Sequence, residues 1–310
     1  MKEQLIQTHN RIQPHVHNTP VLTSHLINEI AGAALYFKCE NFQRMGAFKM
    51  RGAVNAIMQL TDEQKQKGVV THSSGNFAQA LSLAAKSLGV TAYIVMPSNA
   101  PHVKKEAVIA YGGNVIECEP TLKAREQTAE KVQAEKGATF IHPSDDLHVI
   151  LGQGTAAKEL LEVHPDLEYL VTPVGGGGLV AGTILAAQFF GRTCKVIGGE
   201  PENMDDAYRS LLSGKIESNQ GGDTIADGLK TQLGDVNLPI IKEGIQEIIT
   251  VSEQEIRNAM KLIWERMKIV VEASSAVALA AILKKNELFK GKKVGVILSG
   301  GNVDVGNLPF

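Results

Sequence analysis

The chain has 310 residues, of which 44% are hydrophobic and 21% charged, and its formal net charge is −2. These values indicate an ordinary globular protein of one large or two modest domains. They exclude the basic surface that nucleic-acid binding requires, a polybasic membrane patch and, since no apolar run is long enough, a membrane-spanning helix. The first ten residues lack the apolar core of a signal peptide, and Cys39, Cys118 and Cys194 have neither metal-ligand nor redox spacing. We therefore expect a cytoplasmic protein with reduced cysteines and without nucleic-acid or membrane partners.

Hydrophobic spacing predicts strands and helices in alternation along the chain. Helices are expected at 2–12, from 49 onward, at 77–88, 101–110, 121–136 and 147–162, after 175–178, from the capping box of Ser252 and Glu255 onward, and at 274–285. Strands are expected at 35–39, 69–72, 92–96, 114–117, 140–141, in the apolar run before 175, at 194–198 and at 294–298. Residues 213–237 are rich in Gly, Asp, Asn and Gln and are predicted to form an irregular loop. Nearly uniformly apolar strands between helices indicate an α/β fold with parallel sheets covered on both faces.

Four consecutive glycines, Gly175, Gly176, Gly177 and Gly178, join an apolar strand to a helix. Ordering glycine costs more backbone entropy than ordering any other residue, so this junction indicates a backbone that approaches a ligand closely. The free N–H groups and the dipole of a helix N-terminus favour a phosphate; a flexible turn is the alternative. Because the spacing Gly176-x-Gly178-x-x-Ala181 also satisfies the dinucleotide fingerprint weakly, the kind of phosphate stays open at this point.

Two further polar loops follow predicted strands, at 73–76 (Ser-Ser-Gly-Asn) and 299–302 (Ser-Gly-Gly-Asn). Open α/β sheets bind ligands outside the carboxyl ends of their strands, so we expect these loops and the glycines to face one site. Lys49 stands beside Phe48 and Met50 at the start of a helix, where desolvation and the helix dipole lower the pKa of its amine. A free amine is what imine formation requires. Each feature also has an ordinary alternative, namely a solvated lysine, a helix N-cap and a simple turn.

Taken together, these motifs resemble the fold-type II pyridoxal-phosphate enzymes and, within them, the serine/threonine dehydratase and serine racemase branch. The resemblance extends over nearly the whole chain, and the motifs that carry it are Gly46–Ala53, Ser73–Asn76, Gly175–Leu179, Gly198–Asp206, Thr224–Gly228 and Ser299–Asn302. It implies a tryptophan synthase β-like α/β fold with two open, mostly parallel twisted sheets flanked by helices. It also implies a large domain of residues 1–63 and 146–310 and a small inserted domain of residues 64–145 that closes over the substrate.

The resemblance implies pyridoxal 5'-phosphate as the cofactor and gives roles to individual residues. Lys49 would form the internal aldimine and then act as the base at Cα. The other residues implied at the cofactor are Phe48 on a ring face, Asn76 at the ring hydroxyl, Gly175 to Gly178 with Leu179 at the phosphate, Ser299 at the pyridine nitrogen, and Glu272 nearby. A neutral hydroxyl at that nitrogen weakens the electron sink, which favours elimination over transamination.

The resemblance also implies a substrate site at the start of the helix after residue 76. The residues implied there are Ser73, Ser74, Asn76, Phe77 and Arg125. Phe77 departs from the branch, which commonly has histidine at this position; a contact through its backbone N–H would preserve binding of the substrate carboxylate. For Arg125, a solvated helix arginine is the alternative. Ser74 would be the second acid–base group of racemisation, because serine racemases carry serine here and many dedicated dehydratases carry alanine.

Glu200, Asp206 and the carbonyl of Met204 match a divalent-cation site of the branch. Hard oxygen ligands suit Mg²⁺, with Ca²⁺ or Mn²⁺ as further possibilities, and two solvated carboxylates are the alternative reading. Because no regulatory domain follows Phe310, feedback control by a distal end product is not expected. The expected assembly is a homodimer.

We therefore expect α,β-elimination on small 3-hydroxy amino acids such as serine, threonine or 3-hydroxyaspartate, giving a 2-oxo acid and ammonia. Serine racemisation is expected as an accompanying or main activity. The alternatives are a β-replacement enzyme of the same family, a nicotinamide-dependent oxidoreductase that uses the glycine-rich loop, and a catalytically silent binding protein.

Overall fold

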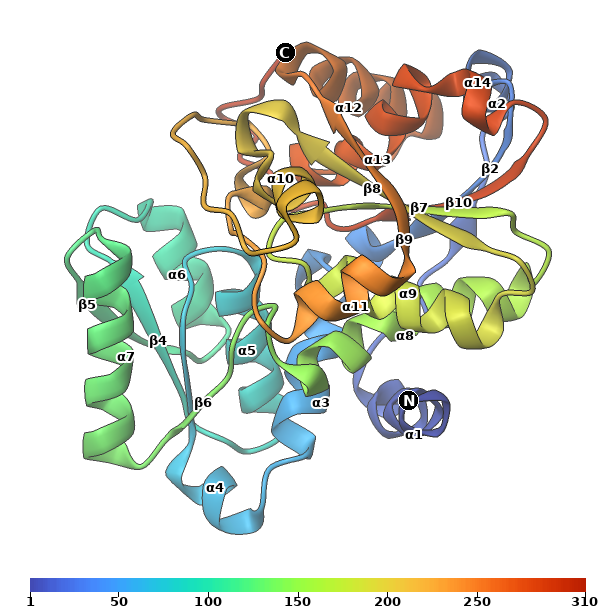
Figure 1. Ribbon diagram of the computed structural model, residues 1–310. Coiled ribbons are helices and arrows are strands. Elements are labelled where there is room, and N and C mark those ends of the chain that lie inside the picture. Colours follow the sequence, from blue (N-terminus) through green and yellow to red (C-terminus); the bar gives the residue numbers. More distant parts are fainter.

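The structure is a computed structural model that describes all of residues 1–310. It contains two sheets with helices on both faces (Figure 1). The larger sheet has six strands in the order β1-β2-β10-β7-β8-β9, and the smaller has four in the order β5-β4-β3-β6. All neighbouring strands are parallel except β1, which pairs antiparallel with β2. The expected α/β architecture with two mostly parallel sheets is confirmed.

The elements of the larger sheet and its helices come from both ends of the chain. They are α1 (Lys2–Ile12), β1 (Val21–Leu22), α2 (His25–Ala31), β2 (Ala34–Cys39), α8 (Leu147–Val163), β7 (Tyr169–Pro173), α9 (Gly178–Phe190), β8 (Lys195–Pro201), α10 (Asp206–Ser213), α11 (Asn237–Gly244), β9 (Ile245–Val251), α12 (Glu253–Met267), α13 (Ala273–Lys284), α14 (Asn286–Phe289) and β10 (Lys293–Leu298). Short 3-10 helices lie at Gln13–His15, Glu40–Phe42, Arg44–Gly46, Glu202–Met204 and Asp227–Leu229.

The smaller sheet is formed by a continuous central part of the chain. Its elements are β3 (Val69–His72), α5 (Asn76–Ser87), β4 (Ala92–Pro97), α6 (His102–Ala110), β5 (Asn114–Cys118), α7 (Leu122–Lys136) and β6 (Thr139–Phe140), preceded by α3 (Lys49–Met58) and α4 (Asp62–Lys67). Helix α3 packs against both α5 and α8 and therefore lies between the two sheets, as Figure 1 shows.

The predicted helices and strands are all present, with ends shifted by a few residues. The capping box at Ser252 and Glu255 is formed as expected. The strands β1 and β9 and the helices α2, α4, α10, α11 and α14 have no counterpart among the predicted elements. Helix α4 buries none of its residues, so it leaves no apolar pattern to detect. Residues 213–237 are largely irregular, as expected, apart from their ends and the 3-10 turn at Asp227–Leu229.

Three large apolar cores hold these layers together. One fills the space between the larger sheet and α12 and α13, and a second lies between the opposite face of that sheet and α8 and α9. The third joins α3 and α5 to one face of the smaller sheet and includes Met50, Ala53 and Phe77. Burial of this kind contributes about 25 cal/mol per Å² of apolar surface removed from water. The start of α3, which carries Lys49, is therefore fixed by packing.

Candidate active site

Lys49 is the first residue of α3, as the sequence predicts. Its amine lies 5.1 Å from the ring centre of Phe48 and 5.7 Å from that of Phe77. Burial lowers the pKa of Lys49 to about 8, against the opposing influence of the Glu272 carboxylate, which favours the charged amine. A lysine with this pKa is partly deprotonated near neutral pH and can act as a nucleophile or as a base.

The C-terminal loop 299–302 lies beside the segment that precedes Lys49. The N–H of Phe48 donates to the carbonyl of Ser299 at 3.0 Å, and Ala47 pairs with Gly300 in an antiparallel bridge. Ser299 is buried. These backbone contacts place the end of β10 and the start of α3 at one edge of the larger sheet, as the rule for parallel strands predicts.

Asn76 connects the small-sheet loop 73–76 to this same edge. Its side-chain amide donates to both carboxylate oxygens of Glu272 at 3.0 Å and accepts from the side chain of Asn302 at 2.9 Å. The backbone N–H of Asn302 also donates to Glu272 at 3.2 Å. Burial raises the pKa of Glu272 to about 7, although these hydrogen bonds favour its charged form. Two of the three predicted loops are thus joined by direct hydrogen bonds.

The four glycines are each in close contact with a different part of the molecule. A Cβ atom would come within 2.7 Å of Leu229 at Gly175, 2.5 Å of Ser144 at Gly176, 2.5 Å of Asn237 at Gly177 and 2.6 Å of Gln153 at Gly178. Gly177 also has a φ of +80°, which L-residues rarely adopt. Alanine would not fit at these positions without displacing a neighbour.

The glycine loop also offers a row of unused hydrogen-bond donors. None of the backbone N–H groups from Gly175 to Val180 donates to another group of the protein, and α9 has no side-chain N-cap. Buried N–H groups in proteins almost always donate a hydrogen bond. A row of N–H groups without an acceptor in the protein therefore fits the binding of an anion. The arrangement meets the requirement of a phosphate site at the positive end of a helix.

The loop after β6 links Lys49 to the glycine loop and was absent from the predicted site. The Lys49 amine donates to the carbonyl of Pro143 at 2.7 Å, and the adjacent Ser144 packs against Gly176. His142 accepts from the N–H groups of Ser144 and Asp145 through Nδ1, and burial lowers its pKa to about 4, so it stays neutral. The loop follows a strand of a parallel sheet, which is the signal that could have found it.

The remaining predicted substrate residues lie on the smaller sheet and its helices. Ser73 and Ser74 are half-buried between β3 and α5, and Phe77 is buried in the first turn of α5. Arg125 lies on α7, close enough to the side chain of His72 to lower its pKa together with burial. The geometry thus brings Ser73, Ser74 and Phe77 next to Asn76, whereas it places Arg125 on a separate helix.

The predicted cation ligands occur together around the start of α10. Glu200 and Asp206 are both 1% exposed, and Met204 lies between them in sequence at the end of a short 3-10 helix. The carboxylate of Glu200 accepts from the N–H groups of Ala207 and Tyr208 at 2.9 Å. One oxygen of Asp206 is buried without any partner, which fits a cation. The structure contains no group of three or more His, Cys, Asp or Glu side chains suited to a metal ion.

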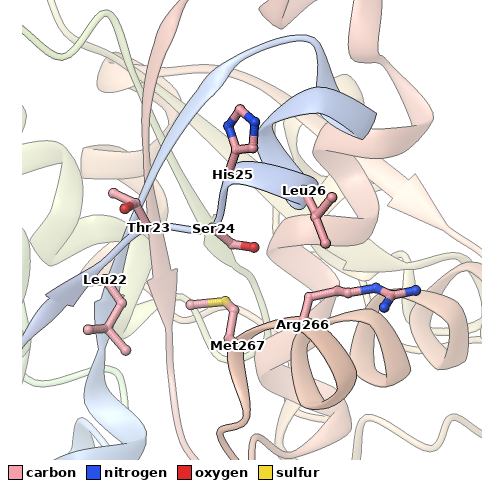
Figure 2. Close-up of a pocket in the computed structure, with 7 residues that line it drawn as sticks. All are labelled: Leu22, Thr23, Ser24, His25, Leu26, Arg266 and Met267. Carbon is pink, nitrogen blue, oxygen red and sulfur yellow. The ribbon is translucent and has the colours of Figure 1, made fainter.

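A separate surface hollow lies between the start of α2 and the end of α12 (Figure 2). It is lined by Leu22, Thr23, Ser24, His25, Leu26, Arg266 and Met267 and includes none of the residues described above. None of the helices combines the length and the apolar character that crossing a membrane requires.

Comparison with known proteins identifies the family of the chain. Residues 12–300 match the family model described as "Pyridoxal-phosphate dependent enzyme". The chain belongs to this family. It is 51% identical to the beta-hydroxyaspartate dehydratase of Paracoccus denitrificans, with 99% of this chain and 98% of that protein covered.

Two solved structures of the pyridoxal-phosphate family are closely similar to this chain. The crystal structure of serine racemase from Dictyostelium discoideum has a TM-score of 0.94 at 51% identity, with coverage of 98% of this chain and 99% of that one. The crystal structure of a threonine deaminase from T.th. has a TM-score of 0.92 at 41% identity, with coverage of 97% and 98%. These matches confirm the resemblance to the fold-type II dehydratase and racemase branch and pyridoxal phosphate as the cofactor. They give no support to the nicotinamide alternative.

Proposed function

We propose that this pyridoxal-phosphate enzyme eliminates water from small 3-hydroxy amino acids and releases a 2-oxo acid and ammonia. The observation that carries the proposal is Lys49, a half-buried amine with a pKa of about 8, which the Pro143–Ser144 segment connects to a row of free N–H groups. The relatives support the reaction class, since their names describe a dehydratase, a deaminase and a racemase of hydroxy amino acids.

Different residues of the chain would bind different parts of the cofactor. The N–H groups of Gly175 to Leu179 would bind its phosphate, and Phe48 would pack on a face of its ring. Asn76, fixed by Glu272 and Asn302, would reach the ring hydroxyl, and Ser299 the ring nitrogen. When bound, pyridoxal phosphate withdraws electrons from the substrate's Cα.

Lys49 would bind the cofactor covalently and then move the proton at Cα of the substrate. Its lowered pKa provides the free amine that accepts this proton, and the Pro143 carbonyl provides an acceptor for the amine when it is not covalently bound. Loss of the β-hydroxyl with a proton, followed by hydrolysis of the C–N bond, balances as one amino acid giving one 2-oxo acid and one ammonium ion.

The substrate carboxylate would lie at the N-terminus of α5. Ser73, Ser74, the side chain of Asn76 and the N–H of Phe77 would bind it there, where the helix dipole favours an anion. Arg125 is the further substrate ligand that the family resemblance suggests.

Residues 64–145 would move as a small domain that closes this site against water. An ion pair supports such contact between the two parts, because the Lys104 amine on α6 donates to Asp227 of the large part at 2.6 Å.

Ser74 would give the enzyme a serine racemase activity beside elimination. Racemisation needs a proton to leave one face of the planar Cα and to return on the other, so a second group must act opposite Lys49. Ser74 lies in the loop that leads into α5, and Phe77 of that helix packs near the Lys49 amine. The serine racemase from Dictyostelium discoideum, at 51% identity, supports this assignment.

We further propose that Glu200, Asp206 and the Met204 carbonyl hold a Mg²⁺, Ca²⁺ or Mn²⁺ ion, and that the enzyme is a cytoplasmic homodimer. Two buried carboxylates that form no ion pair support the cation. Burial disfavours their charged forms and raises the pKa of Glu200 to about 9 and that of Asp206 to about 6, and a divalent ion would stabilise the charges.

A substrate panel tests the proposed function. Purified enzyme loaded with pyridoxal phosphate is incubated with L-serine, L-threonine and 3-hydroxyaspartate, and 2-oxo acid and ammonia are measured together. We expect both products in equal amounts from at least one of them, and none from the Lys49→Ala variant. Reduction of nicotinamide, or no 2-oxo acid from any hydroxy amino acid, would contradict the proposal.

A further inference from the structure

Four charged side chains form a buried network directly behind the turn that carries Lys49. Arg51 on α3 and Lys38 on β2 are positive, and Glu40 after β2 and Glu159 on α8 are negative. None is more than 6% exposed, and Arg51 and Glu40 are not exposed at all. We call these four residues the buried ion network. The site described above uses none of them.

Arg51 is the centre of this network. Its guanidinium donates to Glu40 at 2.7 and 2.9 Å and to Glu159 at 2.7 and 2.8 Å, so it forms a two-pronged contact with each carboxylate. It also donates to the Thr155 hydroxyl and the His17 carbonyl. All three guanidinium nitrogens therefore have acceptors, and the plane of the side chain can take only one orientation.

The other members complete the charge balance. The Lys38 amine donates to Glu159 at 2.6 Å and to the Thr19 carbonyl at 2.7 Å, and the Thr19 hydroxyl donates to Glu40. Burial alone would raise the pKa of Glu159, but the charges and hydrogen bonds of Arg51 and Lys38 outweigh it and lower that pKa. Glu159 is therefore charged at neutral pH, and it lies between the cationic groups of Arg51 and Lys38.

Stability alone does not explain such a network. Removing each ion from water is costly, and apolar replacements of buried ion networks are often neutral or stabilising. The better-attested use of buried ions is to select one arrangement of the elements they join. Here the joined elements are β2, α8 and the first turn of α3.

Within that turn, Met50 packs into the third apolar core, and Arg51 makes the polar contacts. Helix α3 begins at Lys49 without a side-chain N-cap. Lys49 and Arg51 are two residues apart and so project from different sides of the helix. A Cβ on Gly152 of α8 would lie 2.5 Å from the carbonyl oxygen of Arg51, so the two helices touch backbone to backbone at this point. The Arg51 side chain is thus placed to fix how α3 is rotated against α8.

We propose that the buried ion network positions Lys49, with Arg51 fixing the rotation of the first turn of α3 and so holding the Lys49 amine at the Pro143 carbonyl. The inference rests on the proposed role of Lys49 in binding the cofactor covalently. Arg51 touches neither the cofactor site nor the substrate site and is a positioning residue.

The test compares wild type with Arg51→Lys, which keeps the charge but cannot contact two carboxylates in two-pronged fashion. Apoenzyme is mixed with pyridoxal phosphate across a pH series, and the visible absorbance band of the bound cofactor is followed. We expect the band to form roughly 10–100-fold more slowly in the variant, the order of loss that a 1 Å misplacement gives. We also expect the pH midpoint to rise from about 8 toward that of an ordinary lysine.

The titratable groups that act on the Lys49 amine are Glu272, before α13, and His142, on the loop after β6. The Arg51→Lys substitution changes neither of these residues. A change in the pH midpoint would therefore report a displaced amine and not the loss of a neighbouring charge.

Ile263→Ala, which opens a cavity in the core of α12, is the control for lost stability. It should lower the melting temperature and leave both the rate and the pH midpoint unchanged. If Arg51→Lys does not fold, the second variant is Glu40→Gln, which retains the two-pronged contact between Arg51 and Glu159. It should slow formation of the band and raise the pH midpoint, as Arg51→Lys does.

A folded network variant with the rate and midpoint of wild type would overturn the inference, even if it melted earlier. Failure of the underlying function would look different. If Lys49 does not bind the cofactor covalently, the Lys49→Ala variant would still show the visible absorbance band of wild type.

Discussion

The amine of Lys49 donates a 2.7 Å hydrogen bond to the carbonyl oxygen of Pro143, a residue 94 positions further along the chain. This bond joins the start of α3 to the loop after β6, and the next residue of that loop, Ser144, contacts the glycine loop. One short segment therefore contacts both the Lys49 amine and the glycine loop with its free N–H groups, which are distant from each other in sequence.

The first prediction concerns the pH dependence of cofactor binding. Only the uncharged amine of Lys49 attacks an aldehyde, and burial lowers its pKa to about 8. The rate of covalent capture of pyridoxal phosphate should therefore rise about tenfold per pH unit below pH 8 and level off above it. Stopped-flow absorbance with apoenzyme measures this rate. A rate that keeps rising to about pH 10 would show an ordinary, solvated lysine.

The second prediction concerns the glycine loop. Gly177→Ala places a Cβ atom 2.5 Å from the Asn237 side chain at a φ of +80°. The loop must shift, so we expect the dissociation constant of pyridoxal phosphate to rise at least about tenfold, or about 1.4 kcal/mol.

Gly221→Ala is the matched control for this prediction. Gly221 has a φ of +86° but no neighbour within 4 Å of an added Cβ, so it carries the same backbone strain without a clash. Absorbance titration should show unchanged cofactor binding in this control. Equal losses in both variants would mean that the glycine loop has no special role.

The third prediction concerns Ser74. Ser74→Ala should suppress formation of D-serine from L-serine and elimination from D-serine. Elimination from L-serine should largely persist, because Lys49 still removes the proton on its own side of Cα. Chiral chromatography measures the formation of D-serine, and an assay of 2-oxo acid release measures elimination. D-serine formation at the wild-type rate in the variant would refute the role of Ser74, and a wild type that forms no D-serine would be a plain dehydratase.

The fourth prediction concerns the cation. A bound ion stabilises the folded state by mass action, by about 2.7 kcal/mol at roughly 100 times its dissociation constant. Chelation should lower the melting temperature of wild type and added Mg²⁺ should restore it. Glu200→Gln should weaken this response. If a verified metal-free sample melts and turns over like the untreated enzyme, these carboxylates do not hold a functional cation.

Much of the fold and the site could be predicted because it is encoded locally. The alternation of apolar strands with helices is read directly from residue spacing, which also places Lys49 correctly at the first position of a helix. The three polar loops follow strands, and the carboxyl-end rule predicts ligand binding at such loops. The bonds from Asn76 to Glu272 and Asn302 are the observed result.

What could not be predicted depends on contacts between distant elements. Pro143 contributes a backbone carbonyl, which has no sequence signature. Arg51 belongs to one of the motifs that carry the family resemblance, yet its partners Glu40 and Glu159 lie 11 and 108 positions away and no local pattern pairs them. Strand β9 alternates apolar and polar residues only weakly and therefore escapes prediction.

The central claim is that Lys49 binds pyridoxal phosphate covalently. The most direct test is to reduce the holoenzyme with borohydride, digest it and map the modified peptide by mass spectrometry. We predict a single stable pyridoxyl adduct on Lys49, with loss of the visible absorbance band. An adduct on another lysine, or no adduct in protein that has bound the cofactor, would contradict the account.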